Sequence, residues 1–120
     1  MIYFVGIHHK PGKEAFCSTT LSGKKIDAVI KRINDPCIKV NLFTTEYIPV
    51  LQSDEYSREI QGFFKRVPQD NCTIVLLGKA VLDHFPHGYY RHCNVLIFRH
   101  PSFSPPSFVD DLVNFIKLKH

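Results

Sequence analysis

The regular alternation of short apolar runs with helical stripes limits this chain to a small set of folds. Runs of strand length occupy residues 2–7, 38–44, 73–77 and 94–98, and helical periodicity follows each of them. Such alternation is typical of α/β proteins, and right-handed crossovers between successive strands favour a parallel sheet. We therefore expect a three-layer α/β/α fold with a four-stranded parallel sheet and helices on both of its faces.

The helices have recognisable starting points. Ser22 is expected to cap the first helix and Ser53 or Asp54 the second, because short polar side chains accept hydrogen bonds from the free N–H groups of a first turn. Apolar stripes predict that these two helices end near residues 33 and 67. A short helix is expected around residues 80–82 and a last one at residues 108–118.

Length and composition restrict the kind of protein. The 120 residues, 44% of them hydrophobic, are enough for one domain spanning residues 1–120 with a single core. No apolar run approaches the ~20 residues that a membrane span needs, and the apolar start of the chain is typical of a strand rather than a leader. We expect a monomeric cytoplasmic protein with no membrane partner. The net charge of +4 tolerates a polyanionic partner without requiring one.

The cysteines do not predict a metal site. They stand at positions 17, 37, 72 and 93, and no two of them form the C-x-x-C pair that zinc and iron–sulfur sites usually use. We expect small, buried apolar residues that a reducing compartment keeps as thiols.

The loop after the first run resembles a phosphate-binding loop only superficially. Residues 6–13 read G-I-H-H-K-P-G-K, with five residues between the glycines instead of four, and Glu14 follows the lysine. A carboxylate there repels phosphate, so we do not expect nucleotide hydrolysis. A metal site on His8 and His9 is also disfavoured, because adjacent side chains diverge and no third ligand is evident. We expect no metal and no other cofactor.

Parallel sheets bind ligands at the carboxyl ends of their strands. This rule brings residues 8–21, 41–46 and 99–107 to one edge, where we expect the function to lie. His100 comes directly after the last strand, and Pro101 restricts the backbone beside it. Such a placement suits a histidine that points into a cleft.

Five motifs in register resemble the uracil-DNA glycosylase superfamily. They are F-V-G-I-H-H-K-P-G at residues 4–12, S-G-K-K-I-D at 22–27, V-N-L-F at 40–43, I-V-L-L-G-K at 74–79 and R-H-P-S at 99–102. The resemblance covers nearly the whole chain. It implies a base-excision enzyme that hydrolyses the N-glycosidic bond of uracil or a related damaged base in DNA.

The resemblance also implies a pocket for a base that has left the helical stack. Asn41 matches the residue that reads the base, since an amide donates to a pyrimidine oxygen and accepts from N3–H, which cytosine lacks. Phe16 matches the stacking aromatic, with Phe43 as its rival and a core position as the alternative for either. Gly6 and Ile7 are assigned to the same base-binding group.

His100 matches the histidine of the H-P-S motif, which donates a hydrogen bond to the base oxygen as negative charge develops there. The resemblance implies that Ser102 holds a phosphate. The other residues assigned to the phosphate-binding and DNA-binding group are Lys10, Pro11, Gly12 and Arg99. The lysines at positions 24 and 25 are further candidates, for which a solvated helix face is the alternative.

The first loop departs from the family pattern. It carries His8, His9 and Lys10 where most members have a carboxylate or an asparagine that positions water. Only His8 or His9 is chemically suited to act as a base near neutral pH, and Glu14 is a reserve candidate. The rival interpretation is therefore a member of the superfamily that binds a base or nucleic acid without hydrolysing it.

The chain also lacks an obvious leucine-bearing insertion after the H-P-S motif. In the family that insertion wedges into the duplex and fills the gap left by the flipped base. Phe103 and Phe108 are alternative wedges. Without a wedge, single-stranded DNA or DNA with unpaired bases is the favoured partner.

Overall fold

The structure is a computed structural model that describes residues 1–8, 15–45, 49–50, 52–103 and 105–119. Its elements are β1 (Ile2–His8), α1 (Leu21–Arg32), β2 (Cys37–Phe43), α2 (Asp54–Arg66), β3 (Asp70–Leu77), α3 (Lys79–His84), β4 (His92–Phe98) and α4 (Phe108–Lys119). Two short 3-10 turns, η1 (His87–Tyr89) and η2 (Pro101–Phe103), flank β4.

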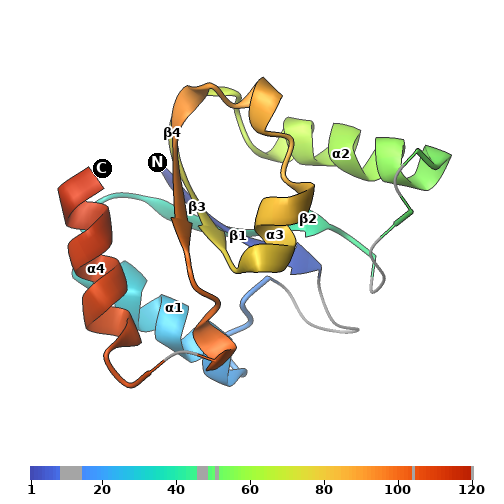
Figure 1. The fold of residues 1–120 in the computed structure, drawn as a ribbon. Coiled ribbons are helices and arrows are strands. Elements are labelled where there is room, and N and C mark those ends of the chain that lie inside the picture. The colour runs from blue at the N-terminus through green and yellow to red at the C-terminus, as the bar shows by residue number, and fades with distance from the viewer. Residues whose placement is uncertain (9–14, 46–48, 51, 104, 120) are drawn as a thin grey trace.

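The four strands form one parallel sheet in the order β2-β1-β3-β4. Figure 1 shows α1 and α4 on one side of this sheet and α2 and α3 on the other. The expected three-layer α/β/α fold is therefore confirmed. No described helix is both long and apolar enough to cross a membrane.

Alternation along the strands divides the core between the two faces of the sheet. Tyr3 and Val5 of β1 pack with the side chains of α2 and α3, whereas Ile2 and Phe4 pack with those of α1 and α4. Burying an aromatic or branched aliphatic side chain contributes about 1.5–3 kcal/mol each, so both layers are needed to hold the sheet.

The ends of the elements differ slightly from the sequence expectations. Thr20, not Ser22, caps α1, because its hydroxyl accepts a hydrogen bond from the N–H of Gly23. Ser53 caps α2 as expected, with its hydroxyl bonded to the N–H of Tyr56. The third and fourth strands begin earlier than predicted because polar residues at their start, such as Asp70, extend the ladder without an apolar signal.

The expectation of buried cysteines is only partly correct. Cys72 is buried, whereas Cys17, Cys37 and Cys93 are half-buried. All four are free thiols, and the Sγ atoms of Cys72 and Cys93 lie 3.3 Å apart on neighbouring strands. Burial is the main cause that raises the pKa of Cys72 to about 12, so this thiol stays protonated near neutral pH.

Candidate functional site

Gly6 creates the space in which two candidate side chains meet. It pairs with Asn41 across β1 and β2, and neighbours in a parallel ladder point to the same face. A Cβ atom on Gly6 would lie 2.8 Å from Oδ1 of Asn41 and 3.1 Å from Cζ of Phe16. The amide and the aromatic ring therefore lie together over a position that has no side chain.

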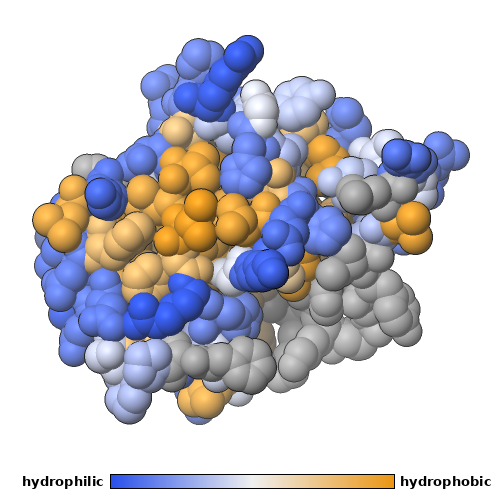
Figure 2. Space-filling view, in the orientation of Figure 1, coloured by the Kyte–Doolittle hydropathy of each residue, from blue (hydrophilic) through white to orange (hydrophobic). Residues whose placement is uncertain are grey.

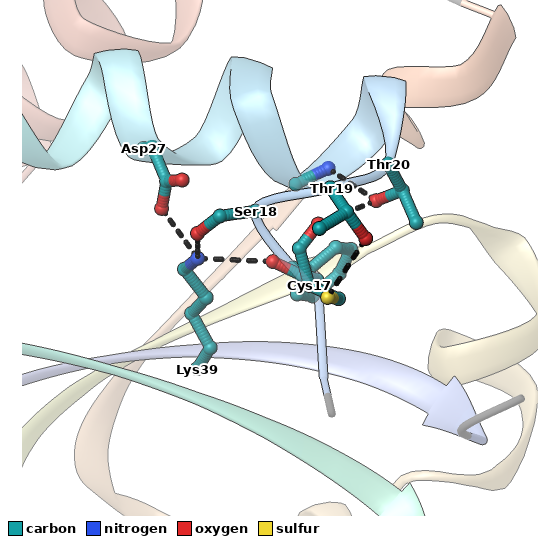
Figure 3. A network of polar contacts seen from close by, with 8 residues as sticks. Cys17, Ser18, Thr19, Thr20, Asp27 and Lys39 are labelled. Atoms are coloured by element: carbon teal, nitrogen blue, oxygen red, sulfur yellow. Dashed lines mark hydrogen bonds and ion pairs between the residues drawn. The ribbon is translucent and has the colours of Figure 1, made fainter. Parts of the chain in front are cut away.

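Phe16 is held by a lysine on the edge strand. The Nζ atom of Lys39 donates a hydrogen bond of 2.9 Å to the carbonyl of Phe16 and forms an ion pair with Asp27 of α1. Figure 3 shows Lys39 reaching from β2 toward Asp27 and Ser18. The hydrogen bond from Lys39 is the largest cause that lowers the pKa of Asp27, and it keeps this carboxylate ionised.

The rest of this loop is built onto the start of α1. The Thr20 hydroxyl donates to the carbonyl of Cys17 at 2.7 Å while it caps the helix (Figure 3). A Cβ atom on Gly23 would lie only 1.8 Å from the same carbonyl oxygen, so any side chain there would displace the loop. Phe16 itself has a φ of 45°, a left-handed conformation that a phenylalanine keeps only when its surroundings impose it.

His100 follows β4 and has a defined hydrogen-bonding state. The backbone N–H of Ser102 donates to its Nδ1 atom at 3.0 Å. The neutral ring must then carry its proton on Nε2, which makes Nε2 a donor. Burial lowers the pKa of His100 below its ordinary value and favours this neutral form.

The His100 and Phe16 rings are neighbours, with centroids 6.3 Å apart and planes tilted by 42°. Gly78, where β3 ends, leaves room for His100, because a Cβ atom there would lie 3.2 Å from the Cβ of His100. The structure thus brings Gly6, Phe16, Asn41 and His100 to the carboxyl edge of the sheet, where the sequence predicted them.

The segment after His100 is anchored to α1. The Nζ atom of Lys25 donates to the carbonyl of Pro101 at 2.9 Å, and the hydroxyls of Ser22 and Ser102 lie 2.7 Å apart. Ser102 is exposed, and its hydroxyl shares its hydrogen bond with Ser22. The hydroxyl that the sequence predicts to hold a phosphate therefore lies beside a second hydroxyl.

The structure separates the rival aromatics. Phe43 is fully buried, and its ring contacts Tyr56 and His84 in the layer of α2 and α3. Phe16, by contrast, lies beside Asn41 and His100. Phe108 is also fully buried, between the sheet and the α1–α4 layer, so the idea of Phe108 as a wedge is wrong.

Two assigned residues have other contacts. The side chain of Ile7 packs against the α2–α3 layer, on the face opposite Gly6. The guanidinium of Arg99 pairs with Asp111 at 2.6 Å and lies 4.6 Å from the ring centroid of Phe98. Outside the described part of the chain lie His9, Lys10, Pro11, Gly12, Glu14 and the side chains of His8 and Phe103.

Sequence reasoning missed the supporting residues Lys39 and Gly78. Lys39 is the one charged residue in the strand sequence at 37–43. A charge within a mostly apolar strand indicates a lysine that forms hydrogen bonds within the protein. Gly78 is singled out in the sequence only as part of the I-V-L-L-G-K motif at residues 74–79. The arrangement at this edge offers an aromatic face, an amide that both donates and accepts, and an imidazole N–H donor, which together suit a planar heterocycle with carbonyl and N–H groups.

A scan of family models, a search of curated proteins and a search of solved structures each found no match to this chain. The case for a function therefore depends on the geometry of the site and on the motifs that it brings together.

Proposed function

We propose that this protein is a DNA base-excision glycosylase that hydrolyses the N-glycosidic bond of uracil or a related damaged base. The observation that carries the proposal is the convergence of Phe16, Asn41 and His100 at one edge of the sheet. These residues come from three segments that are far apart in the sequence, and Asn41 and His100 belong to motifs that resemble the uracil-DNA glycosylase superfamily.

Recognition of the base falls to Asn41 and Phe16. The amide of Asn41 lies beside Gly6, and the residue is only 8% exposed, so its neighbours restrict the orientation of the side chain. It can donate to a pyrimidine oxygen and accept from N3–H, a combination that discriminates uracil from cytosine. The ring of Phe16 provides the stacking face.

His100 stabilises the departing base. Its neutral ring donates from Nε2 to the base oxygen on which negative charge accumulates as the glycosidic bond breaks. A donor that is fixed before the charge appears contributes roughly 3–4 kcal/mol in comparable sites. The hydrogen bond from Ser102 and the anchor from Lys25 provide that fixation.

Hydrolysis also needs a water-activating group, and we assign this role to His8 or His9, with Glu14 in reserve. The alternative function is binding of a base without hydrolysis. One observation favours it: within the described residues, no carboxylate is among the contacts of Phe16, Asn41 and His100.

The partner that we propose is DNA in which the target base is already unpaired. Phe108 lies in the core and offers no wedge, so the cost of unstacking is lowest for a single strand. We propose that the protein acts as a monomer. The four free thiols fit a reducing compartment such as the cytoplasm.

The decisive experiment measures release of free uracil from single-stranded and duplex oligonucleotides with one uracil, followed by alkaline strand cleavage. We expect release by the wild type and a loss of at least about a hundredfold in His100→Ala. His92→Ala, a change at an exposed histidine at the other end of β4, is the matched control and should be as active as the wild type.

The same experiment separates the alternative. If the wild type releases no base from either substrate, the enzyme proposal is wrong. Binding of the uracil-containing strand that weakens in Asn41→Ala would then support a protein that recognises the base without cleaving it.

A further inference from the structure

A cavity adjoins the candidate site and has His100 in its lining. This groove of about 550 Å³ lies between the end of β4 and the start of α3. Its lining is Gly78, Lys79, Leu82, Ile97, Phe98, Arg99 and His100. Its volume is within the range of small-molecule sites, roughly 300–1,000 Å³. We call it the edge groove.

The walls of the edge groove are apolar and open to solvent. Ile97 is 49% exposed although it is an isoleucine in the middle of a β-strand sequence. Figure 2 shows hydrophobic atoms gathered across the face on which β4 is nearest to the viewer. A contiguous apolar surface of this kind usually marks a binding site rather than a solvated face.

The rim of the edge groove carries a lysine. Lys79 is exposed at the start of α3, whereas the guanidinium of Arg99 pairs with Asp111 of α4. An apolar wall with a cation at its edge complements a nucleotide, whose base is flat and apolar on its faces and whose phosphate is anionic.

Some peptide groups of β4 face the free edge of the described sheet. The N–H of Gly78 donates to the carbonyl of Phe98 at 2.9 Å, so the peptide groups of Phe98 point toward β3. Residues of a strand alternate in this respect, and those of Ile97 therefore point to the free edge of the described sheet. A donor and an acceptor on one residue match the edge of a nucleobase.

We propose that the edge groove binds an unpaired base next to the excised one in single-stranded DNA. That base packs on Ile97 and Leu82, its edge meets the peptide groups of Ile97, and Lys79 neutralises the adjoining phosphate. The inference rests on the proposed function for the position of the target base beside His100. It adds a substrate class, a strand that is unpaired for at least two nucleotides.

The test combines changes in the protein with changes in the DNA. The affinity of the protein is measured for single-stranded oligonucleotides that contain one uracil. The nucleotides that flank the uracil, two on each side, are replaced one at a time by a tetrahydrofuran abasic residue. For the wild type we expect one neighbouring position at which loss of the base weakens binding about tenfold. Ile97→Ser should weaken binding of the intact strand similarly and should show almost no further loss with the abasic residue.

Leu118→Ser is the matched control, because Leu118 is 82% exposed on α4 and is outside the groove lining. It should retain wild-type affinity and the full effect of the abasic residue. Lys79→Gln provides a second variant that leaves the apolar wall intact, and it should reduce the salt dependence of binding by somewhat less than one unit in the log–log slope.

Three outcomes would overturn the inference. The first is that no neighbouring position matters in the wild type. The second is that Ile97→Ser remains fully sensitive to the abasic residue. The third is a wild-type dimer in sedimentation velocity that Ile97→Ser dissociates without changing DNA affinity, which would make the groove a protein interface.

The result is also separable from the proposed catalysis. A neighbour effect without release of uracil supports the groove and contradicts the glycosylase. Release of uracil without a neighbour effect supports the glycosylase and contradicts the groove.

Discussion

At the scale of single residues, Gly6 is the position in the candidate site where an added side chain is least tolerated. A methyl group there would come within 2.8 Å of Oδ1 of Asn41 and 3.1 Å of the Phe16 ring, so both groups must move. We expect Gly6→Ala to reduce release of uracil by about a hundredfold, because displacements near 1 Å disturb a positioned site that strongly. Overpacking should lower the free energy of unfolding by about 1–3 kcal/mol. Base-release kinetics and thermal unfolding measure the two effects.

The chain provides a control for this substitution. Nothing lies within 4 Å of a Cβ atom on Gly62, which is inside α2. Gly62→Ala should therefore preserve base release and stabilise the protein by up to about 1 kcal/mol, since alanine is the better helix former. Equal loss of activity in the two variants would show that Gly6 has no special role.

The protonation state of His100 leads to a second prediction at this scale. Protonation would place a proton on Nδ1, which now accepts from the N–H of Ser102, and the two donors would repel each other. Burial lowers the pKa of His100, so the neutral ring persists below the ordinary histidine value of 6.5. We expect the loss of rate that depends on His100 to have its midpoint below pH 6.5. Single-turnover rates across pH 4.5–8 provide the measurement, and a midpoint above 6.5 that is absent from His100→Asn would contradict it.

At the scale of elements, α1 anchors the segment that follows His100. Lys25 of α1 bonds to the carbonyl of Pro101, whereas its neighbour Lys24 is exposed. We expect Lys25→Met to lower the maximal rate of base release about tenfold, because the imidazole is then less well fixed. Lys24→Met should leave the maximal rate unchanged. A change in affinity alone in Lys25→Met would assign this lysine to DNA binding and not to positioning.

The sequence predicted the elements better than their ends. Each strand contains an apolar run, and these runs located all four strands of the sheet. The cap of α1 was misplaced by two residues because Thr20 and Ser22 are equally suitable by type. The residue between them, Leu21, begins the helix but is 68% exposed, so it lies outside the buried stripe that marks the helix in the sequence. The polar start of β3 was missed for a similar reason, since ladder hydrogen bonds hold it without an apolar pattern.

The sequence could predict only those residues of the candidate site whose position follows from the topology of the sheet. Asn41 and His100 stand at strand ends, and the rule for parallel sheets places such residues at one edge. The choice between Phe16 and Phe43 required the structure, because both are phenylalanines near that edge and only packing separates them. Lys39 and Lys25 were missed as supports because their partners are backbone carbonyls, which leave no trace in the sequence.

At the scale of the whole molecule, the ion pair between Lys39 and Asp27 joins the edge of the sheet to the α1 layer. Both side chains are largely shielded, and the pair holds the loop of Phe16 as well. The pKa of Asp27 is lower in the folded protein than its ordinary value of 3.8. The folded state therefore binds fewer protons than the unfolded chain around this pH, and the stability from the pair is complete above pH 3.8 and disappears as pH falls through the folded pKa.

This linkage predicts how two variants behave in acid. Near neutral pH, Asp27→Asn and Lys39→Met should each be less stable than the wild type by about 1 kcal/mol, which corresponds to a Tm lower by roughly 4 °C for a domain of this size. As pH falls below 3.8, the wild type loses the pair that the variants already lack, so their Tm deficits should shrink together. Thermal unfolding of the three proteins from pH 7 to pH 2.5 tests this expectation. Deficits that stay constant to the lowest pH would mean that the lost stability comes from packing of these side chains and not from their charges.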